Sequence, residues 1–128
     1  MLIHLEMQEI YISDKIVVDI ETDGRDNILQ VSYHILDQQN NIIGSRDFLV
    51  YDGEHSKPYY QSNITEEEII ENGISPLLAC EIIARDFSNT NILIGHNIKS
   101  FDCRVINKFM KKIIFMNLIY IQKKFMTR

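Results

Sequence analysis

The first half of the chain alternates runs of β-branched and other apolar residues with polar turn residues. The runs cover residues 16–22, 28–36 and 42–51, and turn residues separate them at 23–27 and 38–41. Such runs are typical of strands that tight turns connect. Because consecutive strands joined by short turns pair antiparallel, the pattern predicts a three-stranded antiparallel meander.

The second half of the chain carries helical patterns around one further strand. Thr65 with Glu68 three residues later fits a capping box, and Asn72-Gly73 is a typical helix end, so a first helix is predicted between them. Ser75 is suited to cap a second helix that starts at Pro76. Residues 92–95 form a short apolar run that predicts a buried strand, and residues 101–112 predict another helix. The apolar residues that recur at helical spacing are Leu77, Leu78, Ile82, Ile83 and Phe87 in the second helix, and Val105, Ile106, Phe109 and Met110 in the last.

This order of elements predicts an α/β domain with a mixed sheet flanked by helices. The meander supplies three antiparallel strands, and a right-handed crossover brings residues 92–95 parallel to the first strand. The 128 residues are enough for one compact domain and too few for two. We therefore expect a single domain over 1–128, with 1–13 as a short leading strand or a loose extension and 107–128 as an atypical basic tail.

The composition is that of a globular protein. The chain is 45% hydrophobic and 24% charged, which excludes a disordered or fibrous class. Cys80 and Cys103 are too few for a disulfide framework and favour a reducing compartment. The N-terminus does not resemble a signal peptide, and no apolar run is long enough to span a bilayer. These features predict an intracellular, cytoplasmic protein without a membrane partner.

Charge is unevenly distributed along the chain. The formal net charge of −5 argues against a protein that coats nucleic acid, but it is compatible with an enzyme that holds cations in a local acidic cluster. Every acidic residue lies at or before Asp102. A solvated helix face with a cationic tail and a phosphate-contacting edge both explain the basic residues beyond it. These are Arg104, Lys108, Lys111, Lys112, Lys123, Lys124 and Arg128.

Asp19 and Glu21 are unusual residues for a predicted central strand. Side chains alternate along a strand, so the two carboxylates share one face while Ile16, Val18 and Ile20 take the other. One interpretation is that the strand frays beside the Asp23-Gly24 turn and leaves both carboxylates exposed. The other follows from Asp102, which would open a helix after the parallel strand. Three carboxylates would then converge at the carboxyl end of the sheet, and their oxygens suit Mg²⁺ or Mn²⁺.

Two motifs extend this second interpretation. The sequence from Asp19 to Gly24, DIETDG, resembles the first motif of the DEDD superfamily of 3′–5′ exonucleases, which includes the proofreading epsilon subunit of DNA polymerase III and ribonuclease T. The sequence from Gly95 to Asp102, GHNIKSFD, resembles the second motif. Residues 28–32 and 64–75 resemble the segments between them, so the similarity covers about 16–106. The resemblance implies a ribonuclease H-like fold that is truncated at the C-terminus.

The resemblance also implies a function and a set of metal ligands. Asp19 would bridge two Mg²⁺ or Mn²⁺ ions, Glu21 would hold one of them, and Asp102 would support the second directly or through water. With two metals, the family hydrolyses nucleic acid from its 3′ end and releases nucleoside 5′-monophosphates. Catalytic roles are thus expected for Asp19, Glu21 and Asp102. The implied substrate is the 3′ end of single-stranded DNA or RNA.

Four further residues match substrate-contacting positions of the family. Thr22 and Gly24 would let the backbone approach the terminal nucleotide. Asn97 and Phe101 would shape the wall beside it.

The third motif of the family, a general-base His followed by a metal-binding Asp, has no counterpart here. No residue after Asp102 is His, Asp or Glu, and His4, His34 and His55 precede the second motif. His96 fits a hydrogen-bonded residue at a strand end better than the base. General-base help is worth about 10²–10⁴ in rate, so we expect the chain alone to be weakly active or inactive unless a partner supplies the missing groups.

Three hypotheses follow from the sequence. The first is a metal-dependent 3′–5′ exonuclease domain, incomplete by itself and completed by a polymerase or another complementing subunit. The second is a catalytically inactive exonuclease-like module that binds nucleic acid or a polymerase partner. The third is an acidic α/β domain with no role in nucleic-acid chemistry.

Overall fold

The computed structural model describes residues 11–59, 62–95, 105–109 and 111. Its elements run in the order β1 (Lys15–Thr22), β2 (Ile28–Leu36), β3 (Ile42–Leu49), α2 (Glu66–Asn72), α3 (Pro76–Ser88) and β4 (Ile92–Ile94). Residues 105–109 are also helical. The described strands and helices follow the predicted order.

A four-stranded mixed sheet forms the centre of the molecule. Its strand order is β3-β2-β1-β4, with β1–β2 and β2–β3 antiparallel and β1–β4 parallel. The meander and the parallel fourth strand are therefore confirmed. Residues 23–27 close the first turn, where the Asp23 amide donates to the Asn27 carbonyl at 3.1 Å.

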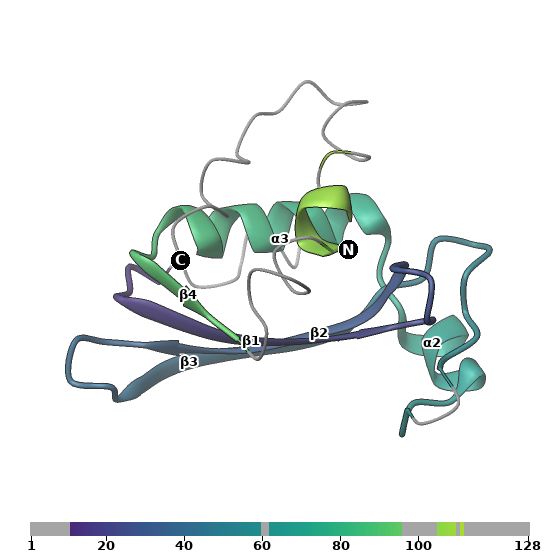
Figure 1. Ribbon diagram of the computed structural model, residues 1–128, viewed down its shortest axis with the longest axis horizontal. Coiled ribbons are helices and arrows are strands. Elements are labelled where there is room, and N and C mark those ends of the chain that lie inside the picture. The colour runs from purple at the N-terminus through teal and green to yellow at the C-terminus, as the bar shows by residue number, and fades with distance from the viewer. Residues whose placement is uncertain (1–10, 60–61, 96–104, 110, 112–128) are drawn as a thin grey trace.

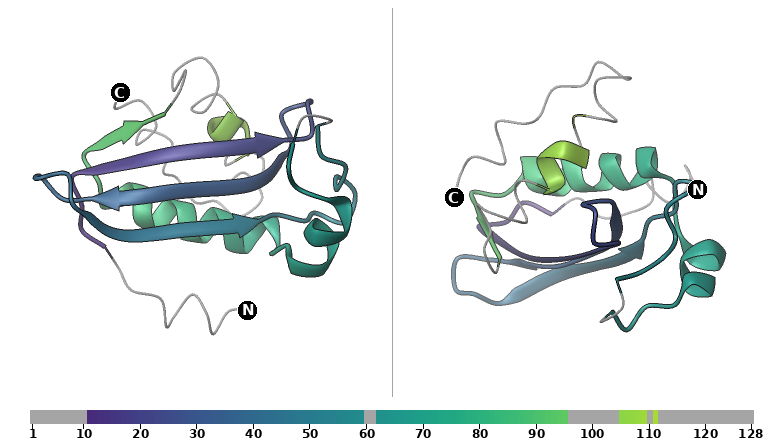
Figure 2. Two further views of the ribbon diagram at one scale, coloured as in Figure 1. Left: turned by 90° about the horizontal axis from the view of Figure 1, so that it is seen from below. Right: turned by 45° about the vertical axis from the view of Figure 1, so that its right-hand side comes forward.

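Helix α3 lies across one face of the sheet, and the helical residues 105–109 lie on the same side (Figures 1 and 2). The core fills the space between these layers. Along β1, the alternating residues Ile16, Val18 and Ile20 are buried in it, and so are Val105 and Ile106. We call the opposite sheet face, which α3 does not cover (Figure 1), the open face.

Both helix starts form as predicted. The Thr65 side chain accepts from the Glu68 amide, and the Glu68 carboxylate accepts from the Thr65 amide, which completes the capping box. The Ser75 hydroxyl accepts from the Leu78 amide at 3.2 Å, and Pro76 is the first residue of α3. These caps satisfy amides that have no partner within the helix.

The helix end at Asn72-Gly73 is confirmed, and Gly73 has a φ of −67°. Glycine is required there because a Cβ would lie 2.5 Å from the Ile69 carbonyl oxygen and 2.7 Å from Tyr51 Cβ. Two local predictions need correction. Leu77 is exposed because it lies in the first turn of α3, beside the buried stripe. β3 ends at Leu49, after which Val50 leaves the antiparallel ladder for a parallel bridge to Ile74. Predictions for residues 96–104, 110 and 112–128 lie outside the described residues.

A buried polar cluster joins the sheet to α3. The Asp86 carboxylate accepts from the Tyr33 hydroxyl at 2.5 Å, from Arg46 Nε at 2.8 Å and from Arg46 Nη2 at 3.1 Å. The Asp86 side chain is fully buried, and the Arg46 guanidinium also stacks 5.1 Å from the Tyr11 ring centre. We call Tyr33, Arg46 and Asp86 the clamp, because they tie β2 and β3 to the helix.

Candidate functional site

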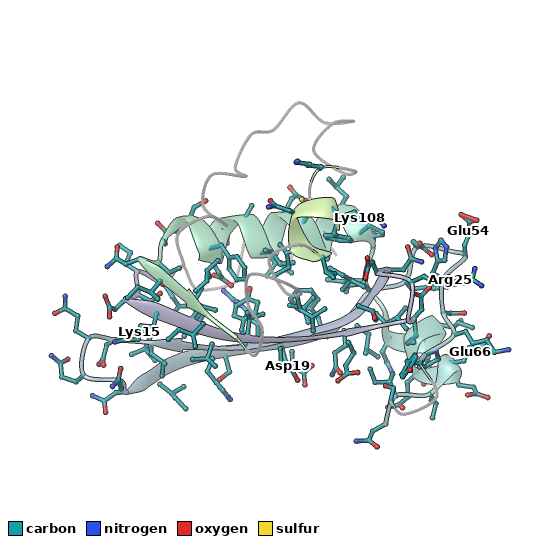
Figure 3. The ribbon with its side chains drawn as sticks, in the orientation of Figure 1. Lys15, Asp19, Arg25, Glu54, Glu66 and Lys108 are labelled. Carbon is teal, nitrogen blue, oxygen red and sulfur yellow. The ribbon has the colours of Figure 1, made fainter. Side chains whose placement is uncertain are left out.

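Asp19 and Glu21 occupy the open face of the sheet. Val18 and Ile20 are buried against α3, whereas Asp19 is exposed and Glu21 half-buried. Figure 3 shows Asp19 projecting from the face opposite α3. The predicted alternation is confirmed, and β1 does not fray before Thr22.

The two carboxylates have uncharged polar neighbours on β2. Asp19 lies opposite Ser32 and Glu21 opposite Gln30 on β2. Gln30 donates to Asp47 of β3 at 2.8 Å, which adds a third acidic side chain to the same face. Within the described part of the chain, neither Asp19 nor Glu21 forms a hydrogen bond or an ion pair. Two carboxylates on one strand face offer the hard oxygen donors that divalent cations prefer.

The turn after β1 holds its shape by local hydrogen bonds. Asp23 accepts from the Arg25 amide at 2.8 Å, the Asn27 amide at 3.3 Å and Asn27 Nδ2 at 2.8 Å. Burial works to raise the pKa of Asp23, but these bonds outweigh it and lower the pKa. The Thr22 hydroxyl accepts from the Gly24 amide at 3.2 Å, so the two predicted substrate-binding residues form one local unit.

Gly24 has a conformation and a neighbour that both require glycine. Its φ is +89°, a region that side chains disfavour, and a Cβ would lie 2.8 Å from Cδ1 of Tyr59. The turn therefore lies directly against the loop that follows β3. Sequence reasoning missed this contact, because the two segments are more than 30 residues apart.

One described segment approaches the turn at the carboxyl end of β1. β4 does not reach this end, because it pairs only with the first half of β1 and ends where Ile94 faces Val17. The helical residues after Asp102 reach the turn, where Lys108 Nζ lies 4.0 Å from Asp26 Oδ2. A cavity of about 300 Å³ lies between the turn and these helical residues, lined in part by Asp26, Asn27, Lys108 and Phe109.

The remaining predicted site residues lie outside the described residues. These are Asn97, Phe101 and Asp102, together with His96. Their proximity to Asp19 stays a prediction. Among the described residues, no three His, Cys, Asp or Glu side chains are grouped as a metal site would require. Asp19 and Glu21 fit a divalent cation by donor chemistry, since both offer hard carboxylate oxygens on one face.

His34, His55 and Cys80 have neighbours that explain them without a catalytic role. His34 is exposed on β2, and its Nδ1 lies 2.8 Å from the Ser45 hydroxyl. His55 Nδ1 lies 2.6 Å from Asp52, and this hydrogen bond raises the pKa of His55. Cys80 is buried in the core, as expected for a structural thiol.

In the described part of the chain no helix is long and apolar enough to cross a membrane.

Comparison with known proteins gives a result for the fold. The sequence matches no family model and no curated protein. Solved structures of E. coli exonuclease I are similar: the complex with a dA16 oligonucleotide has a TM-score of 0.70 at 23% identity, and the complex with a 5cy-dT13 oligonucleotide has 0.71 at 23%. An ExoI/SSB-Ct complex has a TM-score of 0.68 at 22% identity.

These matches cover 80%, 81% and 81% of this chain but only 24%, 25% and 25% of the respective exonuclease I chains. The matched region thus corresponds to about a quarter of exonuclease I. The agreement concerns the arrangement of the sheet and its covering helix. We conclude that this chain has the ribonuclease H-like fold that occurs in exonuclease I.

Proposed function

We propose that this chain is a metal-dependent 3′–5′ exonuclease domain acting on nucleic-acid ends, with Asp19, Glu21 and Asp102 as its metal ligands. One observation carries the proposal: Asp19 and Glu21 stand on the open face near the carboxyl end of β1, without a partner among the described residues. The similarity to exonuclease I, solved with bound oligonucleotides, supports nucleic acid as the substrate class.

The residues present have distinct roles in this proposal. Asp19 and Glu21 hold Mg²⁺ or Mn²⁺, and Asp102 completes the ligand set. A divalent cation held by these carboxylates would supply Lewis-acid chemistry at the phosphate that is cleaved. Thr22 and Gly24 position the terminal nucleotide, because their turn directly follows the carboxylates. Asn97 and Phe101 are proposed to form the wall beside that nucleotide.

Direct metal binding tests the ligand assignment. We expect Mn²⁺ to raise the melting temperature of the wild-type chain, since a ligand at 100 times its Kd stabilises by about 2.7 kcal/mol. Asp19→Asn should abolish most of this shift. Asp47→Asn is the matched control, because Asp47 is a carboxylate on the same face that is not a proposed ligand. An equal Mn²⁺ shift in wild type and Asp19→Asn would refute the assignment.

The reaction itself is tested with single-stranded oligonucleotides labelled at the 5′ end. We expect stepwise shortening from the 3′ end with release of nucleoside 5′-monophosphates, dependent on Mn²⁺ or Mg²⁺ and absent in Glu21→Gln. Single-turnover conditions with excess protein are needed, because a missing general base lowers the rate by about 10²–10⁴. Equal shortening by wild type and Glu21→Gln would show that another nuclease is responsible.

A second candidate is a non-catalytic module that binds nucleic acid or a polymerase partner. The observation that favours it is the lack of any His, Asp or Glu among residues 103–128. It predicts salt-dependent binding of oligonucleotides without shortening. It also predicts no shortening after a His and Asp motif is supplied, whereas the first proposal predicts a gain.

A further inference from the structure

A cavity of about 400 Å³ lies between the turn after β1 and the loop after β3, and we call it the turn pocket. Its lining residues, among those that the structure describes, come from two segments. The turn supplies Asp23 and Arg25, which begin one residue after β1 ends. The loop supplies Glu54, His55, Ser56, Lys57, Pro58 and Tyr59.

Cations of the turn pocket are available for an external anion. Arg25 and Lys57 are exposed, and within the described residues neither forms an ion pair or a hydrogen bond through its side chain. Figure 3 shows Arg25 at the end of the sheet where β1 stops, with Glu54 beside it. Of the two acidic lining residues, Glu54 is exposed, and Asp23 is occupied by three hydrogen bonds within its own turn. The Asp23 carboxylate therefore stabilises its own turn, while Arg25 and Lys57 are exposed to solvent.

The turn pocket also holds an aromatic ring in a defined place. Tyr59 is 45% exposed, and its ring lies against Gly24, where a Cβ would approach Cδ1 to 2.8 Å. Glycine at this position lets the ring approach the turn closely. A partly exposed ring next to unpaired cations is the combination that binds single-stranded nucleic acid, since bases stack on the ring while phosphates meet the cations.

We propose that the turn pocket binds a nucleotide of a single strand, with its phosphate on Arg25 and Lys57 and its base against Tyr59. This inference rests on the proposed function, because it places the strand beside the carboxylate face. It needs no metal, so binding can be measured separately from cleavage. Bases inside a duplex already stack on their neighbours and have no free face for the Tyr59 ring, which is why the proposed ligand is single-stranded.

The test is the salt dependence of binding to a fluorescent oligo(dT) strand in EDTA, where no metal-dependent cleavage occurs. Each lost phosphate contact should lower the slope of log K against log salt by about 0.7 for a single strand. We expect this decrease in Arg25→Gln and again in Lys57→Gln. Lys15→Gln is the matched control, because Lys15 lies at the opposite end of β1. It should leave the slope unchanged.

The aromatic contribution is tested with two variants of one residue. Stacking of a base is worth about 1–3 kcal/mol, so Tyr59→Ala should weaken binding at least about five-fold, while Tyr59→Phe should bind like wild type. Far-UV circular dichroism and melting temperature confirm that each variant is folded. An oligo(U) strand should behave like oligo(dT), because stacking does not sense the sugar.

Two results would overturn the proposal. One is an equal slope in wild type, Arg25→Gln, Lys57→Gln and Lys15→Gln. The other is no binding of wild type at low salt. Both are distinct from failure of the proposed function, which would appear as unchanged Mn²⁺ stabilisation in Asp19→Asn and would leave oligonucleotide binding in EDTA intact.

Discussion

Replacing Asp86 with alanine should be among the most destabilising single changes in the described part of the chain. Asp86 accepts three hydrogen bonds, one from Tyr33 and two from Arg46, and its side chain is fully buried. Alanine would leave a phenol and a largely buried guanidinium without their acceptor. Breaking a buried ion pair in this way costs about 3–5 kcal/mol, because the remaining charge is uncompensated.

This magnitude is large relative to the stability of a small domain. Folded domains are stable by about 5–15 kcal/mol, so the substitution would remove about a fifth or more of the total. For a chain of this size we expect the melting temperature to fall by about 10–20 °C. Urea unfolding followed by circular dichroism gives the free energy of unfolding for wild type and Asp86→Ala.

A double substitution separates the loss of the charge pair from the loss of packing. Arg46→Met with Asp86→Leu replaces both charged partners by apolar side chains, and such replacements are often neutral or stabilising. We expect the double variant to be more stable than Asp86→Ala by several kcal/mol. A cost below about 1 kcal/mol for Asp86→Ala would refute the clamp as a stabilising contact, since even one ordinary hydrogen bond is worth that much.

Three further predictions concern the described core and its glycines. Burial, followed by the negative charge of Asp86, raises the pKa of Tyr33 well above 10. The folded state therefore keeps a proton that the unfolded state loses above pH 10, so stability should fall there, and less so in Tyr33→Phe when urea unfolding is measured at pH 9 and 11. Burial raises the pKa of Cys80 to about 11. At pH 8 this thiol should be alkylated far more slowly in the native than in the unfolded chain, as peptide mass spectrometry would record; equal rates would contradict its burial. Gly73→Ala should cost about 1–3 kcal/mol, because its Cβ would overlap with neighbouring backbone and side-chain atoms. Gly53→Ala should cost about 1–2 kcal/mol through backbone strain, because Gly53 has a φ of +92° although no atom lies within 4 Å of the added Cβ. Thermal unfolding measures both, and wild-type stability in either variant would contradict the overlap or the strain assigned to it.

Much of the fold follows from local sequence patterns. β2 has the predicted bounds, α2 and α3 begin at the predicted caps, and β1 differs by one residue at its start. These elements depend on neighbouring residues, through side-chain alternation and capping. The placement of Asp19 and Glu21 on the face opposite the core follows from the same alternation.

Contacts between distant segments could not be predicted in this way. The clamp joins residues from β2, β3 and α3, and only their folded arrangement reveals it. One signal was present, because Asp86 follows Ile82 by four residues and so lies on the apolar stripe of α3. The reason for glycine at position 73 could not be predicted either, because it lies partly in crowding by Tyr51, a residue far from Gly73 in the sequence.

The side-chain alternation along β1 places both the core residues and the proposed metal ligands, so the register of this strand cannot change without affecting both. If β1 slipped by one residue against β2, Val18 and Ile20 would turn to solvent while Asp19 and Glu21 entered the core. Such a shift would lose apolar burial and desolvate two charges together. An insertion or deletion within β1 should therefore produce an unfolded protein rather than a folded one with misplaced carboxylates.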